Sequence, residues 1–146
     1  MQIQTTRFDA VEINLDDLLL LPNGLLGVEH CRHWVLLEDV ENDAVGWLQS
    51  ATHPEVAMAV ISPRRFVPDY QLRVTRGQLT PLELEAVDQA YILALVSKNH
   101  GQLTLNLKAP LIVNLQRRLG RQIIANDDQP IQYSITSPTA PLRKTA

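Results

Sequence analysis

The sequence predicts an all-β (mainly β) fold, a small β-barrel-like single domain with one or two short helices. One observation is the alternation in residues 103–108, where Leu103, Leu105 and Leu107 share one face and polar residues share the other. This period of two is typical of a strand with one buried face. The other observation is a series of about nine short apolar runs separated by Pro, Asn, Asp and Gly, which favours a barrel or sandwich.

Short apolar runs in the first part of the chain predict strands at residues 2–6, 11–14, 34–37, 47–50 and 56–61. Asp9 is expected to form the turn between the first two strands. A Pro-Asn-Gly turn is predicted at residues 22–24, because proline presets φ and Asn-Gly accepts positive φ. Leu25 and Leu26 follow this turn as a buried plug or an exposed apolar loop, and burial is the favoured interpretation.

One helix is predicted over residues 80–88. Thr80 is expected to be its N-cap, Pro81 occupies the first helical position, and Glu83 follows three residues after the cap. The helix has to end there because residues 91–96 are expected to form a strand. A helix this short depends on packing against the β core.

Residues 103–115 are the most distinctive strand region. Pro110 lacks an N–H group and is expected to end or kink the strand. Asn106 and Asn114 interrupt runs of strong strand formers, so each is expected to make side-chain hydrogen bonds. The alternative is that the face formed by residues 106–108 contacts a partner.

A loop at residues 116–121 is predicted to follow, with Gly120 in the positive-φ position of a hairpin turn. Two further strands are expected at residues 122–125 and 131–135. The Ser-, Thr- and Pro-rich composition of residues 136–146 predicts a disordered C-terminal tail. The folded domain is therefore expected to span residues 1–135.

The protein is expected to be cytoplasmic and to have no membrane partner. Its single cysteine, Cys31, fits a reducing compartment. The first residues contain no apolar segment typical of a signal peptide. Apolar runs such as residues 18–21 are far too short to cross a bilayer.

Acidic residues are concentrated in the first part of the chain. Residues 1–58 contain ten acidic and two basic side chains, a net charge of −8, whereas residues 59–146 contain six acidic and eleven basic ones, a net charge of +5. This asymmetry predicts an acidic surface for a basic partner if the two parts stay separate in the fold. If they interleave, the charges average out. The densest acidic segment is residues 38–43.

No enzyme activity, metal or cofactor is expected, because the sequence has no recognisable catalytic motif. Glu29, His30, Cys31 and His33 are possible metal ligands, but a second ligand cluster is missing and His53 stands alone in the sequence. A nucleophilic Cys31 would need a histidine base within reach. A metal- or thiol-dependent enzyme is therefore the least favoured alternative.

An oligonucleotide-binding small β-barrel is a second alternative. Arg117, Arg118 and Arg121 form a basic hairpin tip, and residues 64–66 join two arginines to a phenylalanine. Barrels of this size bind single strands through basic grooves and stacked aromatics. Aromatics make up only 5% of the residues and the net charge is −3, so the overall field opposes a polyanion. Direct nucleic-acid binding is therefore not expected.

Five segments in order closely resemble the flagellar assembly factor (FliW) family of bacteria. They are residues 21–29 (Leu-Pro-Asn-Gly-Leu-Leu-Gly-Val-Glu), 47–50 (Trp-Leu-Gln-Ser), 66–70 (Phe-Val-Pro-Asp-Tyr), 103–114 (Leu-Thr-Leu-Asn-Leu-Lys-Ala-Pro-Leu-Ile-Val-Asn) and 120–124 (Gly-Arg-Gln-Ile-Ile). The resemblance covers about residues 1–135. The chain departs from the family pattern in carrying Leu21 and Val28 where phenylalanine is usual.

The resemblance implies a non-enzymatic regulator with two protein partners. Members of the family bind flagellin, and alternatively bind the RNA-binding regulator CsrA. Bound CsrA no longer represses translation of flagellin mRNA, and the antagonism is allosteric, so the factor does not need to touch RNA.

Candidate partner-binding residues follow from chemistry. CsrA presents basic residues to RNA, so an acidic segment would attract it. An apolar loop and a β-edge would suit flagellin. The candidates are Leu25, Leu26, Glu38, Asp39, Glu41, Asp43, Asn106 and Lys108.

Overall fold

The computed structural model describes residues 1–86 and 89–135. Its strands are β1 (Gln2–Thr5), β2 (Asp9–Glu12), β3 (Leu18–Leu20), β4 (His33–Glu38), β5 (Val45–Ser50), β6 (Ala57–Ile61), β7 (Ala90–Asn99), β8 (Gln102–Asn114), β9 (Leu119–Gln122) and β10 (Tyr133–Ser134). Its helical segments include α1 (Arg76–Leu79) and the 3-10 turns η1 (Leu15–Asp17), η2 (Pro63–Arg65) and η3 (Thr80–Leu82).

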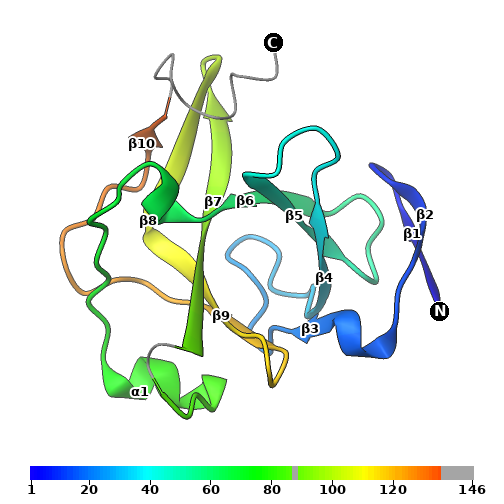
Figure 1. The fold of residues 1–146 in the computed structure, drawn as a ribbon, viewed down its shortest axis with the longest axis horizontal. Coiled ribbons are helices and arrows are strands. Elements are labelled where there is room, and N and C mark those ends of the chain that lie inside the picture. Colours follow the sequence, from blue (N-terminus) through cyan, green and yellow to red (C-terminus); the bar gives the residue numbers. More distant parts are fainter. Residues whose placement is uncertain (87–88, 136–146) are drawn as a thin grey trace.

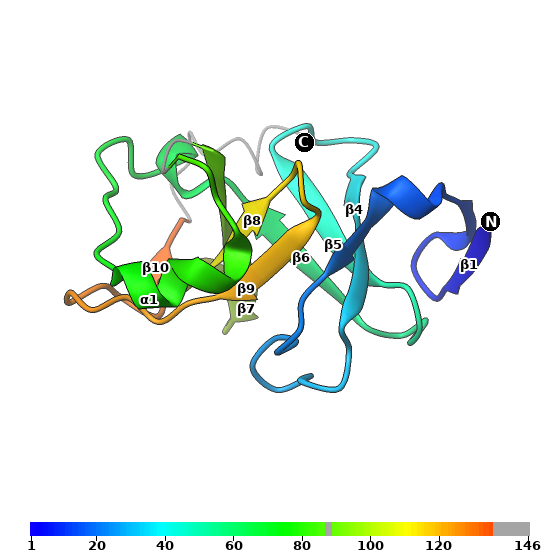
Figure 2. The ribbon, with the colours of Figure 1, turned by 90° about the horizontal axis from the view of Figure 1, so that it is seen from below.

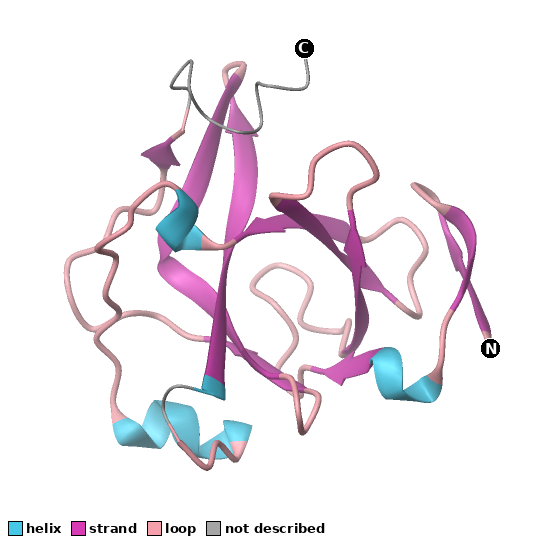
Figure 3. Cartoon of the chain, in the orientation of Figure 1, coloured by secondary structure: helices cyan, strands magenta, loops and turns pink. Residues whose placement is uncertain are grey.

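Seven of these strands close into a barrel, as Figures 1 and 3 show. The order around the barrel is β8, β7, β6, β5, β4, β3 and β9, and β9 pairs with β8 again. Neighbours are antiparallel except β3 and β9, which are parallel and pair Leu20 with Leu119. The β1–β2 hairpin forms a separate two-stranded sheet, and β10 extends the barrel sheet beside β8. The predicted mainly β barrel is therefore confirmed.

The barrel interior is filled by large apolar side chains from opposite walls. Leu19, Trp34, Leu48 and Leu111 are fully buried in one cluster. Burying a side chain of this size contributes about 1.5–3 kcal/mol. A second cluster includes Tyr70, which lies in the connection between β6 and α1 and is anchored to the barrel wall.

Strand β8 continues through Pro110, so the prediction that this residue ends the strand is wrong. The expected irregularity is present in the pairing with β7, where Leu93 faces Leu111 but Leu95 faces Asn106. The four residues between them on β8 therefore oppose a single residue of β7. The N–H groups of Leu107 and Lys108 bond instead to the carbonyl of Pro130, at 3.0 and 3.1 Å.

Asn106 makes the side-chain hydrogen bonds that its position in a strand predicts. Its Oδ1 accepts from the N–H groups of Lys108 and Ala109, at 3.1 and 2.9 Å, and so shapes the irregular part of β8.

Asn114 also makes side-chain hydrogen bonds, at the end of β8. Its Nδ2 donates to the carbonyl of Leu82 at 2.9 Å, and its Oδ1 accepts from the N–H of Gln116 at 3.1 Å. The prediction of side-chain hydrogen bonds is therefore confirmed for both asparagines.

The predicted helix at residues 80–88 is wrong over the residues that the structure describes. Helix α1 begins earlier, because Thr75 and Gln78 form a reciprocal capping box: Thr75 Oγ1 accepts from Gln78 N–H at 3.1 Å, and Gln78 Oε1 accepts from Thr75 N–H at 2.7 Å. Thr80 lies inside the helical segment and starts a 3-10 turn that ends at Glu83, whose φ of 55° is left-handed. Residues 87–88 lie outside the described residues.

The predicted role of Gly120 is also wrong. Arg118, not Gly120, adopts the positive φ of the β8–β9 turn, at 55°. Gly120 lies within β9, where a Cβ atom would be 2.9 Å from Leu21 Cδ1. Glycine is therefore present to let the Leu21 side chain approach the strand. The strand predicted at residues 122–125 is shifted to β9, and the strand predicted at residues 131–135 is shortened to β10.

The Pro-Asn-Gly turn at residues 22–24 has the expected conformation, with Gly24 at a φ of 63° and its N–H bonded to the carbonyl of Leu21 at 2.8 Å. None of the helical segments in residues 1–86 and 89–135 has the length and hydrophobicity of a membrane span. The predicted tail at residues 136–146 lies outside the described residues.

Candidate functional site

The acidic segment forms the loop between β4 and β5, and its own side chains fix its shape. Asp39 Oδ2 accepts hydrogen bonds from the N–H groups of Glu41 and Asn42, at 3.1 and 3.0 Å. Asn42 Oδ1 accepts from Ala44 N–H at 2.9 Å. Short polar side chains that bond to nearby backbone in this way define turns. The loop is therefore ordered before any partner binds.

Asp39 also ties the loop to the barrel wall. Its Oδ1 accepts a 3.0 Å hydrogen bond from Trp47 Nε1 on β5. This bond lowers the pKa of the Asp39 carboxyl from its ordinary value, with smaller contributions from the two backbone N–H groups and from Arg7, while partial burial opposes the shift. Asp39 therefore stays ionised at neutral pH, and its carboxylate stabilises the loop.

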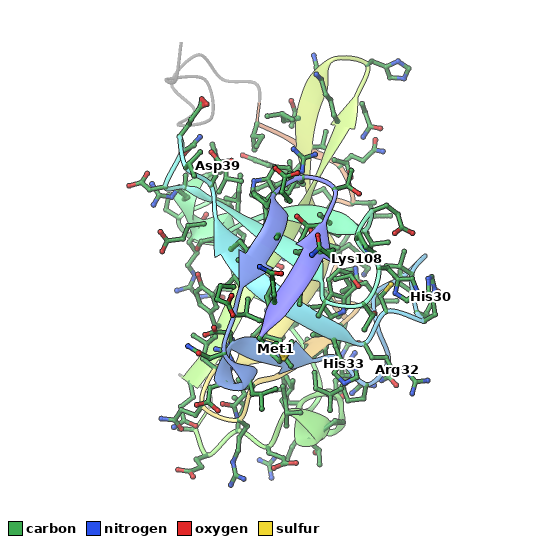
Figure 4. All side chains as sticks on the ribbon, turned by 90° about the vertical axis from the view of Figure 1, so that its right-hand side faces the viewer. Met1, His30, Arg32, His33, Asp39 and Lys108 are labelled. Carbon is green, nitrogen blue, oxygen red and sulfur yellow. The ribbon has the colours of Figure 1, made fainter. Side chains whose placement is uncertain are left out.

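The β1–β2 hairpin packs against the other side of Trp47. The Arg7 guanidinium lies 3.9 Å from the centroid of the Trp47 ring, and the Phe8 ring meets it edge-on at 6.2 Å. Figure 4 shows Asp39 beyond one end of the hairpin and Met1 at the other end. Trp47 thus joins the hairpin, the acidic loop and the barrel.

The other acidic side chains of the segment face solvent. Glu38, Glu41 and Asp43 are exposed, and Val40 at the tip is 95% exposed. The ion pairs within residues 1–86 and 89–135 join the Met1 amino group to Glu12 and Arg117 to Glu83. No described residue therefore forms an ion pair with the loop carboxylates, so the negative charge that the loop presents to solvent is not neutralised by such a pair.

An apolar groove of about 290 Å³ lies next to the acidic loop. Asp39, Glu41 and Asn42 form its polar rim, and its apolar walls come from Val45, Trp47, Ala59, Ile61, Val96 and Leu103. In Figure 1 the β4–β5 loop and the β7–β8 hairpin project from the same end of the barrel. A concave apolar surface with an acidic rim suits an apolar side chain flanked by basic residues.

Two strands diverge at this groove. Strand β6 pairs with β7 only through Val60 with Leu95 and Ile61 with Ala94. Beyond these pairs, residues 57–59 and 96–99 separate, and residues of both strands line the groove. These stretches are the partly open β-edge of a barrel that is otherwise closed.

Of the two leucines expected near a partner, the structure exposes only one. Leu26 is 61% exposed, whereas Leu25 is 1% exposed and packs in the core. The assignment of Leu25 as a contact residue is therefore corrected. The loop that holds Leu26 precedes β4 and the acidic loop follows it, so the two lie at opposite ends of a six-residue strand, which is about 20 Å long. Figure 2 shows the two loops on opposite sides of the barrel.

Asn106 and Lys108 are used within the protein and lie outside the lining of the groove. Lys108 Nζ donates a 2.7 Å hydrogen bond to the carbonyl of Asp127 and so holds the turn after β9. Nearby, the Tyr70 hydroxyl donates to the carbonyl of Leu107 at 2.7 Å. Burial, with a further contribution from Asp127, raises the pKa of Tyr70 to about 12.

The basic hairpin tip is also engaged by the protein's own backbone. The Arg118 guanidinium donates to the carbonyl of Asp17 at 2.8 Å, and that of Arg121 donates to Gln78 at 2.7 Å. Arg117 pairs with Glu83 at 3.7 Å. Donors used in this way are less available to phosphates, so the geometry does not favour the oligonucleotide-binding alternative.

The acidic and basic parts of the chain stay apart in space. The elements of residues 1–58, from β1 to β5, lie on the right of Figure 1, whereas β7, β8, β10 and α1 lie to the left. The charge difference between the two parts of the sequence is therefore also a difference between two sides of the molecule. A basic partner would be attracted to the side that carries the acidic loop.

Sequence reasoning missed Trp47 as the partner of Asp39. The two residues are eight positions apart and meet only because β4 and β5 pair as a hairpin, with Glu38 opposite Gly46. The apolar runs on both sides of the acidic segment were the signal for that pairing. Sequence reasoning also missed that His53 lies next to His30, because the loops that hold the two residues meet only in the folded barrel.

The closed barrel, with an ordered acidic loop beside an apolar groove, defines a small β-barrel protein that offers a surface to other proteins. Residues 2–136 match the family described as FliW protein. The chain belongs to this family of flagellar assembly factors, and the resemblance seen in its sequence is confirmed.

Named relatives and a solved structure agree with this assignment. The flagellar assembly factor FliW of Bdellovibrio bacteriovorus is 38% identical over 130 residues, which cover 88% of this chain and 74% of that protein. The one from Natranaerobius thermophilus is 33% identical, over 94% of this chain and 91% of that protein. A crystal structure of the flagellar assembly factor FliW shares the fold, with a TM-score of 0.81 at 24% identity over 92% of this chain and 94% of that chain.

Proposed function

We propose that this protein regulates flagellar assembly in the cytoplasm by binding proteins and not by catalysis. Its partners are flagellin and, in an alternative complex, the translational regulator CsrA. The observation that carries the proposal is membership of the FliW family over residues 2–136. The ordered acidic loop and the adjacent groove supply a surface of suitable chemistry.

CsrA is proposed to approach the acidic side of the molecule. A protein that binds RNA must present basic residues to phosphates, so opposite charge steers it toward Glu38, Glu41 and Asp43. The complex antagonises CsrA allosterically, without contact between this protein and RNA. Repression of flagellin mRNA translation is thereby relieved.

Flagellin is proposed to use the apolar features of the surface. Leu26 is an exposed apolar residue, and the groove between β6 and β7 has open strand edges on both sides. An extended segment can add main-chain hydrogen bonds at such an edge while its side chains fill the groove. Export of flagellin would free the protein to bind CsrA.

Co-purification with each partner tests the proposal. The protein is mixed with purified flagellin or with purified CsrA and passed over a size-exclusion column, and flagellin is then added to the CsrA complex. We expect a soluble complex in each case and release of CsrA by flagellin. Absence of both complexes would refute the proposed function.

A further inference from the structure

Two histidines and the single cysteine meet where the loop before β4 touches the loop between β5 and β6. One ligand atom each from His30, Cys31 and His53 lies within 4.8 Å of the other two. Cys31 is fully buried, His53 is half-buried and His30 is exposed, so the cluster runs from the core to the surface. The sequence shows His30 and Cys31 as neighbours, and the fold adds the third member.

The position of Cys31 is fixed by its backbone. Its N–H donates to the carbonyl of Val28 at 3.0 Å, and its own carbonyl accepts a 2.9 Å hydrogen bond from Trp34 Nε1. Trp34 is fully buried in the barrel core. The thiol is therefore held in place before any ligand binds.

His53 is held in a similar way. Ser50 Oγ accepts from the N–H groups of Thr52 and His53, at 3.3 and 3.0 Å, and so defines the turn. His53 Nδ1 lies 2.8 Å from Thr52 Oγ1. When Nδ1 carries the proton and donates to this hydroxyl, the lone pair of Nε2 is free. A partner of this kind on the second nitrogen is the usual support of a metal-bound imidazole.

The two imidazoles approach edge to face. Their centroids are 4.8 Å apart and their planes differ by 82°. In a tetrahedral zinc site the distances between ligand atoms are about 3.3–3.6 Å, given bonds of roughly 2.0–2.3 Å. Closing from 4.8 Å requires a shift of about 1 Å. The exposed His30 side chain can make this shift without disturbing the core.

We propose that His30, Cys31 and His53 form a binding site for a thiophilic divalent metal ion, with Zn²⁺ as the best fit to two imidazoles and one thiolate. Water completes the tetrahedron. On binding, the Cys31 S–H bond breaks, a metal–sulfur bond forms and the proton passes to solvent. The ion joins the loop before β4 to the loop after β5. Figure 4 shows His30 well away from Asp39, so the site is separate from the acidic loop.

Metal titration of the full chain, without a histidine tag and after chelator treatment, tests the site. Co²⁺ is the probe, because a bound thiolate gives a cobalt charge-transfer band that imidazoles alone do not give. We expect the band to saturate at one equivalent and to be lost when Zn²⁺ is added. We also expect about one proton to be released per ion at a pH where the thiol is protonated.

Variants show which residues bind the ion. His53→Gln and His30→Gln are each expected to weaken Zn²⁺ binding more than tenfold, and Cys31→Ser should also remove the cobalt band. Thr52→Val should weaken binding by roughly 10- to 100-fold through loss of orientation. His100→Asn, a loop histidine with a φ of 52°, is the matched control and should bind as the parent does. Circular dichroism shows whether each variant is folded.

Absence of the cobalt band at one equivalent would overturn the proposal. So would unchanged Zn²⁺ affinity in a folded His53→Gln protein. Loss of binding in His100→Asn would likewise place the ion elsewhere.

Discussion

Trp47 Nε1 donates a 3.0 Å hydrogen bond to Asp39 Oδ1, and this contact joins the acidic loop to the barrel wall. The same carboxylate holds the loop backbone through Glu41 and Asn42. One acidic residue is therefore committed to the architecture of the loop. Its neighbours Glu41 and Asp43 remain available for a partner.

Trp47→Phe removes this hydrogen bond and keeps an aromatic ring. We expect a loss of about 1 kcal/mol in the free energy of unfolding at pH 7, at the low end for a bond to a charged group because the carboxylate is open to water. Urea denaturation measures it. The Asp39 pKa is lowered in the fold, so its stabilisation is present above the unfolded value near 3.8 and is lost as pH falls through the folded value.

The difference between the parent protein and Trp47→Phe should therefore shrink below pH 3.8. A difference that stays constant from pH 7 to acid would show that the indole ring, and not its hydrogen bond, accounts for the loss.

Replacing Glu41 and Asp43 together by lysine tests the steering of CsrA. We expect the association rate at low salt to fall at least tenfold, because the long-range attraction becomes repulsion. Stopped-flow measurements over a range of salt concentrations give the rate. Flagellin binding should change less, since the contacts proposed for flagellin are mainly apolar.

The matched control for this double variant is Glu85→Lys with Asp128→Lys. Both residues are exposed and belong to the less acidic part of the chain, and the change in net charge is the same. Equal losses of CsrA association in the two doubles would mean that net charge alone, and not the loop, attracts this partner.

Tyr70→Phe removes the bond from a buried hydroxyl to the Leu107 carbonyl. We expect a loss of about 1–2 kcal/mol in the free energy of unfolding at neutral pH. The pKa of Tyr70 rises from 10.0 to about 12 in the fold. Its stabilisation is therefore present below pH 10 and is lost as pH rises toward 12.

Urea unfolding at pH 9 and near pH 12 checks the sign. The parent protein should lose more stability over this interval than Tyr70→Phe, because its phenol ionises in the unfolded chain at a lower pH than in the fold. Tyr133→Phe is the control, since Tyr133 lies on the exposed strand β10. Identical alkaline losses in the parent and Tyr70→Phe would contradict the assignment.

Gly120→Ala should destabilise the barrel, whereas Gly77→Ala should stabilise it. A Cβ at position 120 would lie 2.9 Å from Leu21 Cδ1, and overpacking of this kind costs about 1–3 kcal/mol. At position 77, in α1, the closest atom would be 3.9 Å away, and alanine gains roughly 0.5–1 kcal/mol in a helix. Thermal denaturation of the parent and of both variants measures the two changes in stability.

A shorter side chain at position 21 should partly rescue the alanine at position 120. The double variant Gly120→Ala with Leu21→Val should therefore be more stable than the sum of the single changes predicts. Additive losses would show that the glycine is needed for a reason other than space for Leu21.

The sequence predicted those features that depend on neighbours along the chain. Alternation identified strand β8, and depletion of asparagine in strands identified the bonding role of Asn106, because both effects are local. The helix prediction failed because Thr80 with Glu83 has the same spacing as Thr75 with Gln78, and only the second pair forms a reciprocal cap in the fold.

Features that depend on barrel closure were not predictable in this way. The close approach of Leu21 to Gly120 and the meeting of His53 with Cys31 join segments whose contact no periodicity encodes. The acidic segment was recognisable as a surface from its charge alone. That Asp39 bonds to the barrel wall while Glu41 and Asp43 face solvent could be known only from the β4–β5 register.

The parallel pairing of β3 with β9 sets the order in which the molecule can be completed during synthesis. Leu20 N–H bonds to the carbonyl of Arg118 at 2.9 Å, so the seam of the barrel joins residues nearly a hundred positions apart. A nascent chain displays its acidic half long before the ribosome has made β9. Contacts this distant in sequence form late. The barrel can therefore close only when translation of the domain is almost over.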